Sequence, residues 1–363
     1  MIDESVIDGN VVATAVSRGI LSAEQAGALD RLAAELAGES RSPIPYTPDD
    51  EALRLITGFA DIFVTLGLVL FLAAVRYLSG ALLPGLGLSW FVLAAVAWLL
   101  AEFFTRRRRM ALPSIVLLAV FVGSSFLALL HGFAALTGDA DIAAGNYLAF
   151  VNGYPMVASV AALATSVAAF LHYLRFRVPI TVAAGAIALA GALFAGLLAA
   201  APGLVRPHVT ALIFVLGLAI FVLAMRFDMS DKARVTRRTD VAFWLHLAAA
   251  PMIVHPLFAG IGADFEQVSF GQAVAVLGAF LVLGVVAVII DRRAILVSGL
   301  VYAGIACATL LKNAGASDLM LPTTLLVLGA FILLLSAGWQ PLRRVFLRGL
   351  PLSLTLRLPN PVT

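Results

Sequence analysis

The sequence predicts an all-α protein, a polytopic membrane helix bundle of about ten transmembrane helices with a small cytoplasmic N-terminal helical hairpin. Composition is the first reason, because 62% of the residues are hydrophobic and only 12% are charged, which excludes a soluble globular protein. The second reason is a series of apolar segments, each suited in length to ~30 Å of hydrocarbon at ~1.5 Å per residue. The segments are Thr57–Tyr77, Leu83–Phe104, Leu112–Leu136, Tyr154–Leu174, Val178–Ala201, Val209–Phe227, Val241–Ala259, Gly271–Ile290, Ala294–Leu311 and Leu319–Trp339.

The distribution of Lys and Arg predicts how these segments thread the membrane. With the N-terminus in the cytoplasm, 21 of the 24 basic residues fall on the inner side, and the exceptions are Arg76, Arg206 and Lys312. The positive-inside rule then places both termini in the cytoplasm. The basic loops lie beside anionic headgroups, which accounts for the excess positive charge without any nucleic-acid partner.

The cellular address follows from composition as well. The chain has many Arg residues and few Lys, with abundant Ala and Gly, which favours a bacterial protein of the inner membrane. The first apolar run begins near Leu55 behind an acidic start, so we expect no cleaved signal peptide. Cys307 is the single cysteine and is interpreted as a packing residue.

Residues 1–38 predict a cytoplasmic helical hairpin. Gly19 is placed to end a first helix, and Ser22 with Gln25 has the spacing of a capping box that opens a second. Two such short helices bury too little surface to be stable alone, so we expect them to dock on the bundle, on another copy or on a protein partner.

The stretch Gly19-Ile20-Leu21-Ser22-Ala23-Glu24-Gln25-Ala26 resembles the helical hairpin that opens several families of bacterial polytopic membrane proteins of unknown function. The resemblance covers about the first 40 residues, and the remainder is similar in architecture alone. It implies a multi-pass membrane protein and carries no activity or catalytic residue.

The remaining domain boundaries follow from proline and charge. Residues 39–48 form a linker in which three prolines block regular structure, and residues 49–340 form the transmembrane domain. Residues 341–363 predict an amphipathic cytoplasmic tail, with Leu342, Val345 and Phe346 toward lipid and Arg343, Arg344 and Arg348 toward headgroups.

A basic turn recurs near residues 107, 176, 234 and 292. Duplication of a helical hairpin would produce this recurrence, and so would the ordinary alternation of helices with basic cytoplasmic turns, which we favour. Ten spans also permit two five-span halves of inverted topology, a common transporter plan.

Asp61 is the clearest candidate for a functional group, because a carboxylate facing lipid near the start of a span would cost roughly 2.5–3.5 kcal/mol. It shares a helix face with Thr57 and Thr65 and is therefore predicted to face the bundle interior. One hypothesis is a proton- or cation-binding site at Asp61, Thr57 and Thr65. The other is a structural contact between helices, which we favour.

The seventh segment contains Pro251 and Pro256, which predict a kinked or broken helix whose freed carbonyls line a cavity. His246 lies at about the depth of Asp61, so the two are expected to pair as a proton relay or cation site. Asp240 and Asp291 precede spans and are interpreted as helix caps.

The histidines also raise a metal or haem hypothesis, which we do not favour. His131 and His255 lie toward the outer side, whereas His172 and His246 lie toward the inner side, and a membrane di-haem protein needs two ligands at each depth. No short-spaced metal-ligand cluster accompanies them. We expect no cofactor.

The sequence therefore favours a small-solute or ion transporter or channel-like protein, and not an enzyme. The motifs of phosphate-binding loops, nucleophile elbows and zinc proteases are missing from the sequence. The alternative is a non-transporting sensor or assembly protein that acts through its N-terminal hairpin.

Overall fold

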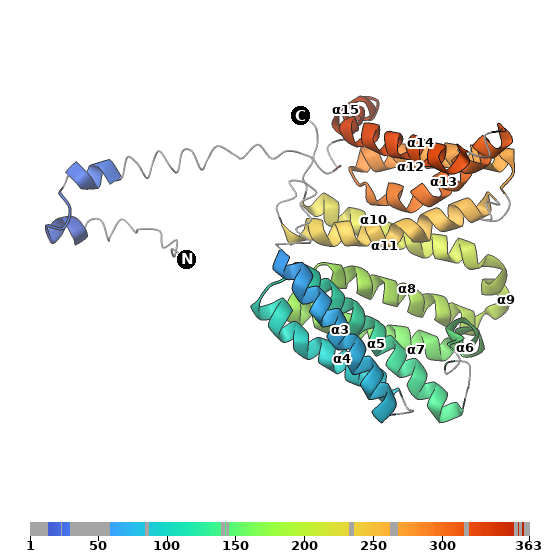
Figure 1. Ribbon diagram of the computed structural model, residues 1–363, viewed down its shortest axis with the longest axis horizontal. Coiled ribbons are helices and arrows are strands. Elements are labelled where there is room, and N and C mark those ends of the chain that lie inside the picture. The colour runs from blue at the N-terminus through green and yellow to red at the C-terminus, as the bar shows by residue number, and fades with distance from the viewer. Residues whose placement is uncertain are drawn as a thin grey trace. The chain divides into compact units, whose positions relative to one another are not determined.

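The computed structural model confirms an all-α polytopic architecture (Figure 1). It describes residues 14–22, 24–29, 59–83, 87–138, 142, 145–231, 236–261, 268–315, 319–351, 355 and 358. The linker at 39–48, Thr57 and most of the tail beyond 351 lie outside these residues. The chain divides into two compact units, residues 1–52 and 53–363.

In the first unit, the described residues agree with the predicted helix ends. Gly19 has a φ of 69°, the left-handed conformation in which a glycine commonly ends a helix. Ser22 and Gln25 cap each other, because the Gln25 backbone N–H donates to Ser22 Oγ at 3.1 Å and the Ser22 N–H donates to Gln25 Oε1 at 2.9 Å.

Ten helices of the described second unit are long and apolar enough to cross a membrane, so this is a multi-pass membrane protein in contact with the lipid bilayer. The second span begins at Leu88, later than predicted, and ends in a π-helix, while Trp339 opens a separate helix. The elements are α3 Phe59–Leu82, α4 Leu88–Ala101, η1 Glu102–Arg107, α5 Ala111–Thr137, α6 Tyr147–Gly153, α7 Pro155–Phe176, α8 Ile180–Ala200, α9 Pro202–Val205, η2 Arg206–His208, α10 Val209–Ser230, α11 Arg237–Gly260, α12 Phe270–Ile290, α13 Ala294–Asn313, α14 Met320–Ala337 and α15 Trp339–Arg348.

The spans pack most extensively as consecutive hairpins, α4 with α5, α7 with α8, α10 with α11, and α12 with α13. Each hairpin turns at one of the four basic stretches recognised in the sequence. Neighbouring hairpins meet where α5 contacts α7, α8 contacts α11, and α11 contacts α13. Figure 1 shows these pairs following one another across the second unit in chain order.

Three of the turns share a backbone feature. Arg109, Arg177 and Asp291 have φ values of 52°, 57° and 58°, the left-handed region that residues other than glycine seldom enter. Each follows the first helix of its hairpin, where a left-handed residue ends the helix and reverses the chain.

Helix α11 is the most enclosed span, with 61% of its apolar stretch buried, against 6% for α14. It continues as one α-helix through Pro251 and Pro256, so the prolines do not break it, while the predicted kink stays a prediction. A proline removes one backbone donor, and the hydrogen bonds and packing on either side maintain the helix. The packing is close here, because a Cβ built on Gly217 of α10 would lie 2.8 Å from Met252 Cβ.

Helix α15 differs from the predicted amphipathic orientation at Arg343, whereas Leu342, Arg344, Val345 and Arg348 are exposed. Trp339 and Arg343 are buried, at 2% and 1% exposed, so Arg343 does not face headgroups. Val345 on the opposite face is exposed. The helix therefore covers the ends of neighbouring spans, and it packs on α12 and α14.

A candidate functional site at a buried charge network

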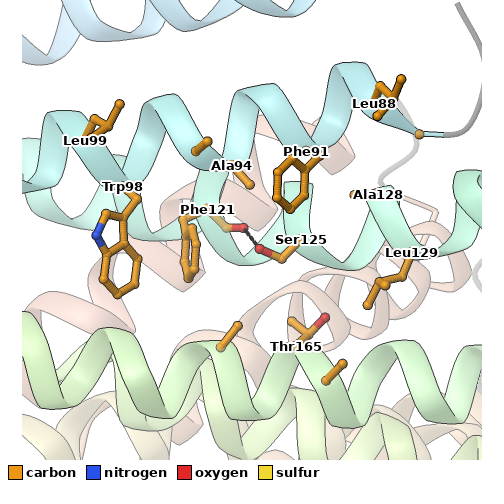
Figure 2. Close-up of a pocket in the computed structure, with 14 residues that line it drawn as sticks. Leu88, Phe91, Ala94, Trp98, Leu99, Phe121, Ser125, Ala128, Leu129 and Thr165 are labelled. Carbon is orange, nitrogen blue, oxygen red and sulfur yellow. Dashed lines mark hydrogen bonds between the residues drawn. The ribbon is translucent and has the colours of Figure 1, made fainter.

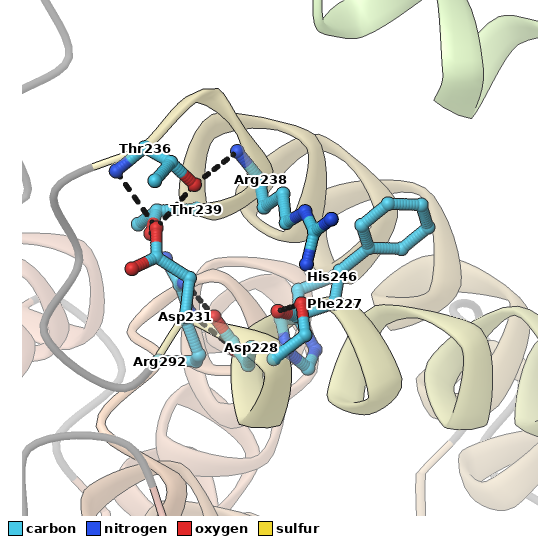
Figure 3. Close-up of polar contacts among 9 residues, drawn as sticks. Phe227, Asp228, Asp231, Thr236, Arg238, Thr239, His246 and Arg292 are labelled. Carbon is cyan, nitrogen blue, oxygen red and sulfur yellow. Dashed lines mark hydrogen bonds and ion pairs between the residues drawn. The ribbon is translucent and has the colours of Figure 1, made fainter.

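The site is centred on Asp228, a fully buried carboxylate two residues before the end of α10. Arg292 donates two hydrogen bonds to this carboxylate, from Nε to Oδ2 at 2.9 Å and from Nη2 to Oδ1. His246 of α11 places Nε2 2.9 Å from Asp228 Oδ2. Figure 3 shows the three side chains converging between α10, α11 and the turn after α12. All three are at most 1% exposed.

The turn between α12 and α13 positions Arg292. Asp291 ends α12 in the left-handed conformation, which aims the next residue back toward α10. Asp291 Oδ1 accepts a hydrogen bond from Trp339 Nε1 at 2.7 Å, and the Arg293 guanidinium lies 5.0 Å from the centre of the Trp339 ring. The turn is thereby held against α15. Asp291 is not the N-cap of α13, since that position is Arg293.

A second carboxylate, Asp231, organises the start of α11. Its Oδ2 accepts hydrogen bonds from the Thr236 backbone N–H at 2.8 Å, the Thr236 hydroxyl at 2.6 Å and the Thr239 hydroxyl at 3.1 Å (Figure 3). Thr236 in turn caps α11 by accepting from the Arg238 N–H at 3.2 Å. The predicted cap Asp240 lies inside the first turn instead. These bonds fix His246 relative to Asp228 because they join the ends of their two helices.

The network has a defined protonation pattern while Asp228 is ionised. A carboxylate only accepts hydrogen bonds, so Nε2 of His246 must carry a proton to bond with it. The bidentate arginine contact is the strong form of a charge-assisted hydrogen bond. Asp228 and Arg292 neutralise each other, and a second proton on His246 would leave the cluster with one positive charge.

Asp61 is buried in α3, as predicted, at 2% exposed. Thr65 Oγ1 donates to the backbone carbonyl of Asp61 at 2.6 Å and not to its carboxylate. Helix α3 packs mainly on α4 and α5, and His246 bonds with Asp228. The expected pairing of Asp61 with His246 stays a prediction.

His131, His255 and His172 lie in separate places. His131 Nε2 lies 3.3 Å from the Tyr147 hydroxyl, and His255 Nδ1 bonds with the Tyr302 hydroxyl. His172 is buried beside Thr181 and rings of Trp98, Phe121 and Phe176. Within the part of the chain that the structure describes, no group of three or more His, Cys, Asp or Glu residues could hold a metal ion.

Sequence reasoning missed Asp228 and Arg292. The predicted sixth segment ends at Phe227, three residues before the end of α10, so it leaves Asp228 out, and Arg292 enters the prediction only as a charge that sets orientation. The available signal was an aspartate in each of these basic turns, at Asp228 and Asp231 in one and at Asp291 in the other.

Comparisons with protein-family models, with curated proteins and with solved structures find no match to this chain.

Proposed function

We propose that this protein carries a small solute or an ion across the membrane, and that Asp228, His246 and Arg292 form its charge-binding site. The observation that supports this is a set of three buried ionisable side chains in which Asp228 contacts both His246 and Arg292. Ionisable groups inside membrane proteins are costly and commonly mark pathways for ions and substrates.

Stability alone is a weak reason to have such a cluster. A buried ion pair gives little or no net stabilisation relative to well-packed apolar residues of similar volume. The cluster has a function if a solute replaces one member of the ion pair. An anionic solute would compete with Asp228 for Arg292, and a cation would compete with Arg292 for Asp228. His246 belongs to the residue type that titrates nearest neutral pH, which suits coupling to protons.

The orientation and address in this proposal are those inferred from charge. The four hairpin turns carry the basic residues, which supports a cytoplasmic location for them and for both termini. The site then lies at the cytoplasmic end of α10, and the membrane is the inner membrane of a bacterium. Asp61 is a further buried carboxylate that a cation pathway would use.

A thermal-shift screen of the purified protein in detergent tests the proposal. The probes are Na⁺, K⁺, inorganic phosphate, small carboxylates and amino acids, each at several pH values. A ligand at 100 times its dissociation constant stabilises the native state by about 2.7 kcal/mol. We expect at least one stabiliser whose effect disappears in His246→Gln and is unchanged in His131→Gln, the control. No stabiliser, or equal stabilisation of both variants, would contradict the proposed site.

A second candidate is an interaction protein that acts through the N-terminal hairpin. It is favoured by exposed apolar side chains beside the capped turn, with Ile20 71% and Leu29 39% exposed. A partner protein would cover these side chains. Ile20→Ser with Leu29→Ser should then abolish co-purification of that partner while the membrane unit keeps its thermal stability.

A further inference from the structure

Two adjoining cavities follow one side of α4 and its π-helical extension. The larger has a volume of about 650 Å³ and lies between α4, α5 and α7. Figure 2 shows Phe91, Trp98 and Phe121 directed from α4 and α5 toward α7, which contributes Thr165. The cavity lies within three membrane spans, so its surroundings are hydrocarbon and not water.

The wall of this cavity is apolar even at Ser125 and Thr165, because the hydroxyl groups of these two side chains are already hydrogen-bonded. Ser125 Oγ donates to the Phe121 carbonyl and Thr165 Oγ1 donates to the Ala161 carbonyl, both at 2.7 Å. Each hydroxyl therefore donates its hydrogen bond to the backbone of its own helix and not into the cavity. Aromatic and aliphatic groups make up most of the remaining lining, which fits a hydrocarbon chain.

The smaller cavity has a volume of about 400 Å³ and is polar. Leu99 lines both cavities, so the two are neighbours on this helix. The lining residues on this helix recur every three or four positions, which places them on one face. From the apolar end to the polar end they include Leu88, Phe91, Ala95, Trp98, Leu99, Glu102, Phe103, Arg106 and Arg107.

The polar end is positively charged despite the presence of Glu102. The Glu102 carboxylate receives two hydrogen bonds from Arg175, at 2.7 and 2.9 Å, and an ion pair from Arg106 at 3.3 Å. Arg106 and Arg107 line this cavity together with Glu102, and Arg175 is bonded to Glu102 from outside the lining. Two guanidinium groups and one carboxylate give the lining a net charge of about +1 toward an anion that enters.

The apolar part has the length of one lipid leaflet. Eleven residues separate Leu88 from Leu99, which corresponds to ~16 Å along a helix at ~1.5 Å per residue. Half of a ~30 Å hydrocarbon core is ~15 Å. About ten residues of helix span that length, so an acyl chain whose phosphate lies at Arg106 reaches the part of the larger cavity near Ala95 and Trp98.

We propose that this groove binds one anionic phospholipid, with an acyl chain between α4, α5 and α7 and the phosphate at Arg106 and Arg107. The Glu102–Arg175 pair holds the π-helix against α7 and so positions the two arginines.

Native mass spectrometry of the full-length protein tests this, with phosphatidylglycerol and phosphatidylcholine of identical chains as probes. We expect one phosphatidylglycerol to bind in preference to phosphatidylcholine. Arg106→Gln with Arg107→Gln should weaken its binding about 30-fold, since each basic residue contributes roughly fivefold near an anionic headgroup. The exposed pair Arg237→Gln with Arg238→Gln removes the same charge elsewhere and should leave binding within about threefold.

The acyl chain is tested by filling the larger cavity. Ala95 and Ala164 line it and are exposed, so Ala95→Phe with Ala164→Phe should fold normally and weaken both lipids at least tenfold. Ala73→Phe with Ala74→Phe, on the exposed side of α3, is the control. Gel filtration confirms folding in each case. Equal binding of the two lipids, or phenylalanine variants that bind normally while inorganic phosphate competes, would overturn the proposal.

Discussion

Asp228 illustrates how a buried charge depends on its partners. Arg292 and His246 supply three hydrogen bonds to its two oxygens, and none of the three side chains is more than 1% exposed. Removing either charge leaves the other buried without compensation, which is more costly than losing the contact.

Asp228→Asn should therefore destabilise the protein by about 3–5 kcal/mol. Replacing both charges in Asp228→Leu with Arg292→Met should restore most of that stability and abolish ligand stabilisation. Thermal unfolding in detergent measures both effects. Glu102→Gln breaks an exposed ion pair and serves as the control, expected to cost less than about 1 kcal/mol. A mild loss in Asp228→Asn would show that the carboxylate does not balance Arg292.

At the scale of elements, the helical hairpin is the unit of packing, and the α10–α11 hairpin depends on a close crossing. Gly217 faces Met252 with no room for a side chain, because an added Cβ would lie 3.0 Å from the Met252 carbonyl carbon and 3.1 Å from its oxygen. The same hairpin carries Asp228 and His246, so the crossing also sets the distance between them.

Gly217→Ala should destabilise the protein by about 1–3 kcal/mol through overpacking. It should also weaken the ligand stabilisation that depends on His246. Gly278→Ala in α12 is the matched control, since nothing lies within 4 Å of the added Cβ and alanine is the better helix former. The measurement is thermal unfolding of the two variants side by side. Equal stability would mean that the α10–α11 crossing accommodates the added methyl group, which would contradict the prediction.

The membrane-spanning helices are the part of the structure that the sequence predicts best. Ten spans follow from hydropathy alone, because helices that cross a membrane need long apolar runs. The packing partners did not follow, because Asp228 and Arg292 are 64 residues apart and stand beside loop arginines of the same kind. The continuity of α11 through Pro251 and Pro256 was missed for another reason, since local propensity is overridden by the neighbouring helices.

At the scale of the whole molecule, the four hairpin turns all belong to one side of the membrane. Consecutive spans alternate in direction, and the four turns follow Arg107, Phe176, Ser230 and Ile290, each at the end of the first helix of a hairpin. This arrangement concentrates the basic residues, the charge network and the basic end of the lipid groove on a single face. Arg76 and Arg206 belong to the opposite side.

Thiol labelling in intact cells tests the orientation. With Cys307→Ser as background, cysteines introduced as Arg107→Cys and Arg293→Cys should resist a membrane-impermeant maleimide until the membrane is broken. Arg206→Cys should react at once. The reverse pattern would place the hairpin turns outside and would contradict the positive-inside assignment.

Asp291 joins two requirements in one residue. Its backbone occupies the left-handed region, which glycine and asparagine tolerate best. Its side chain ties the turn to Trp339. A replacement by glycine satisfies the first requirement and loses the second, whereas most other residues fail the first. The same residue therefore determines both the reversal of the chain after α12 and the attachment of α15. Few single substitutions at this position can change one and leave the other intact.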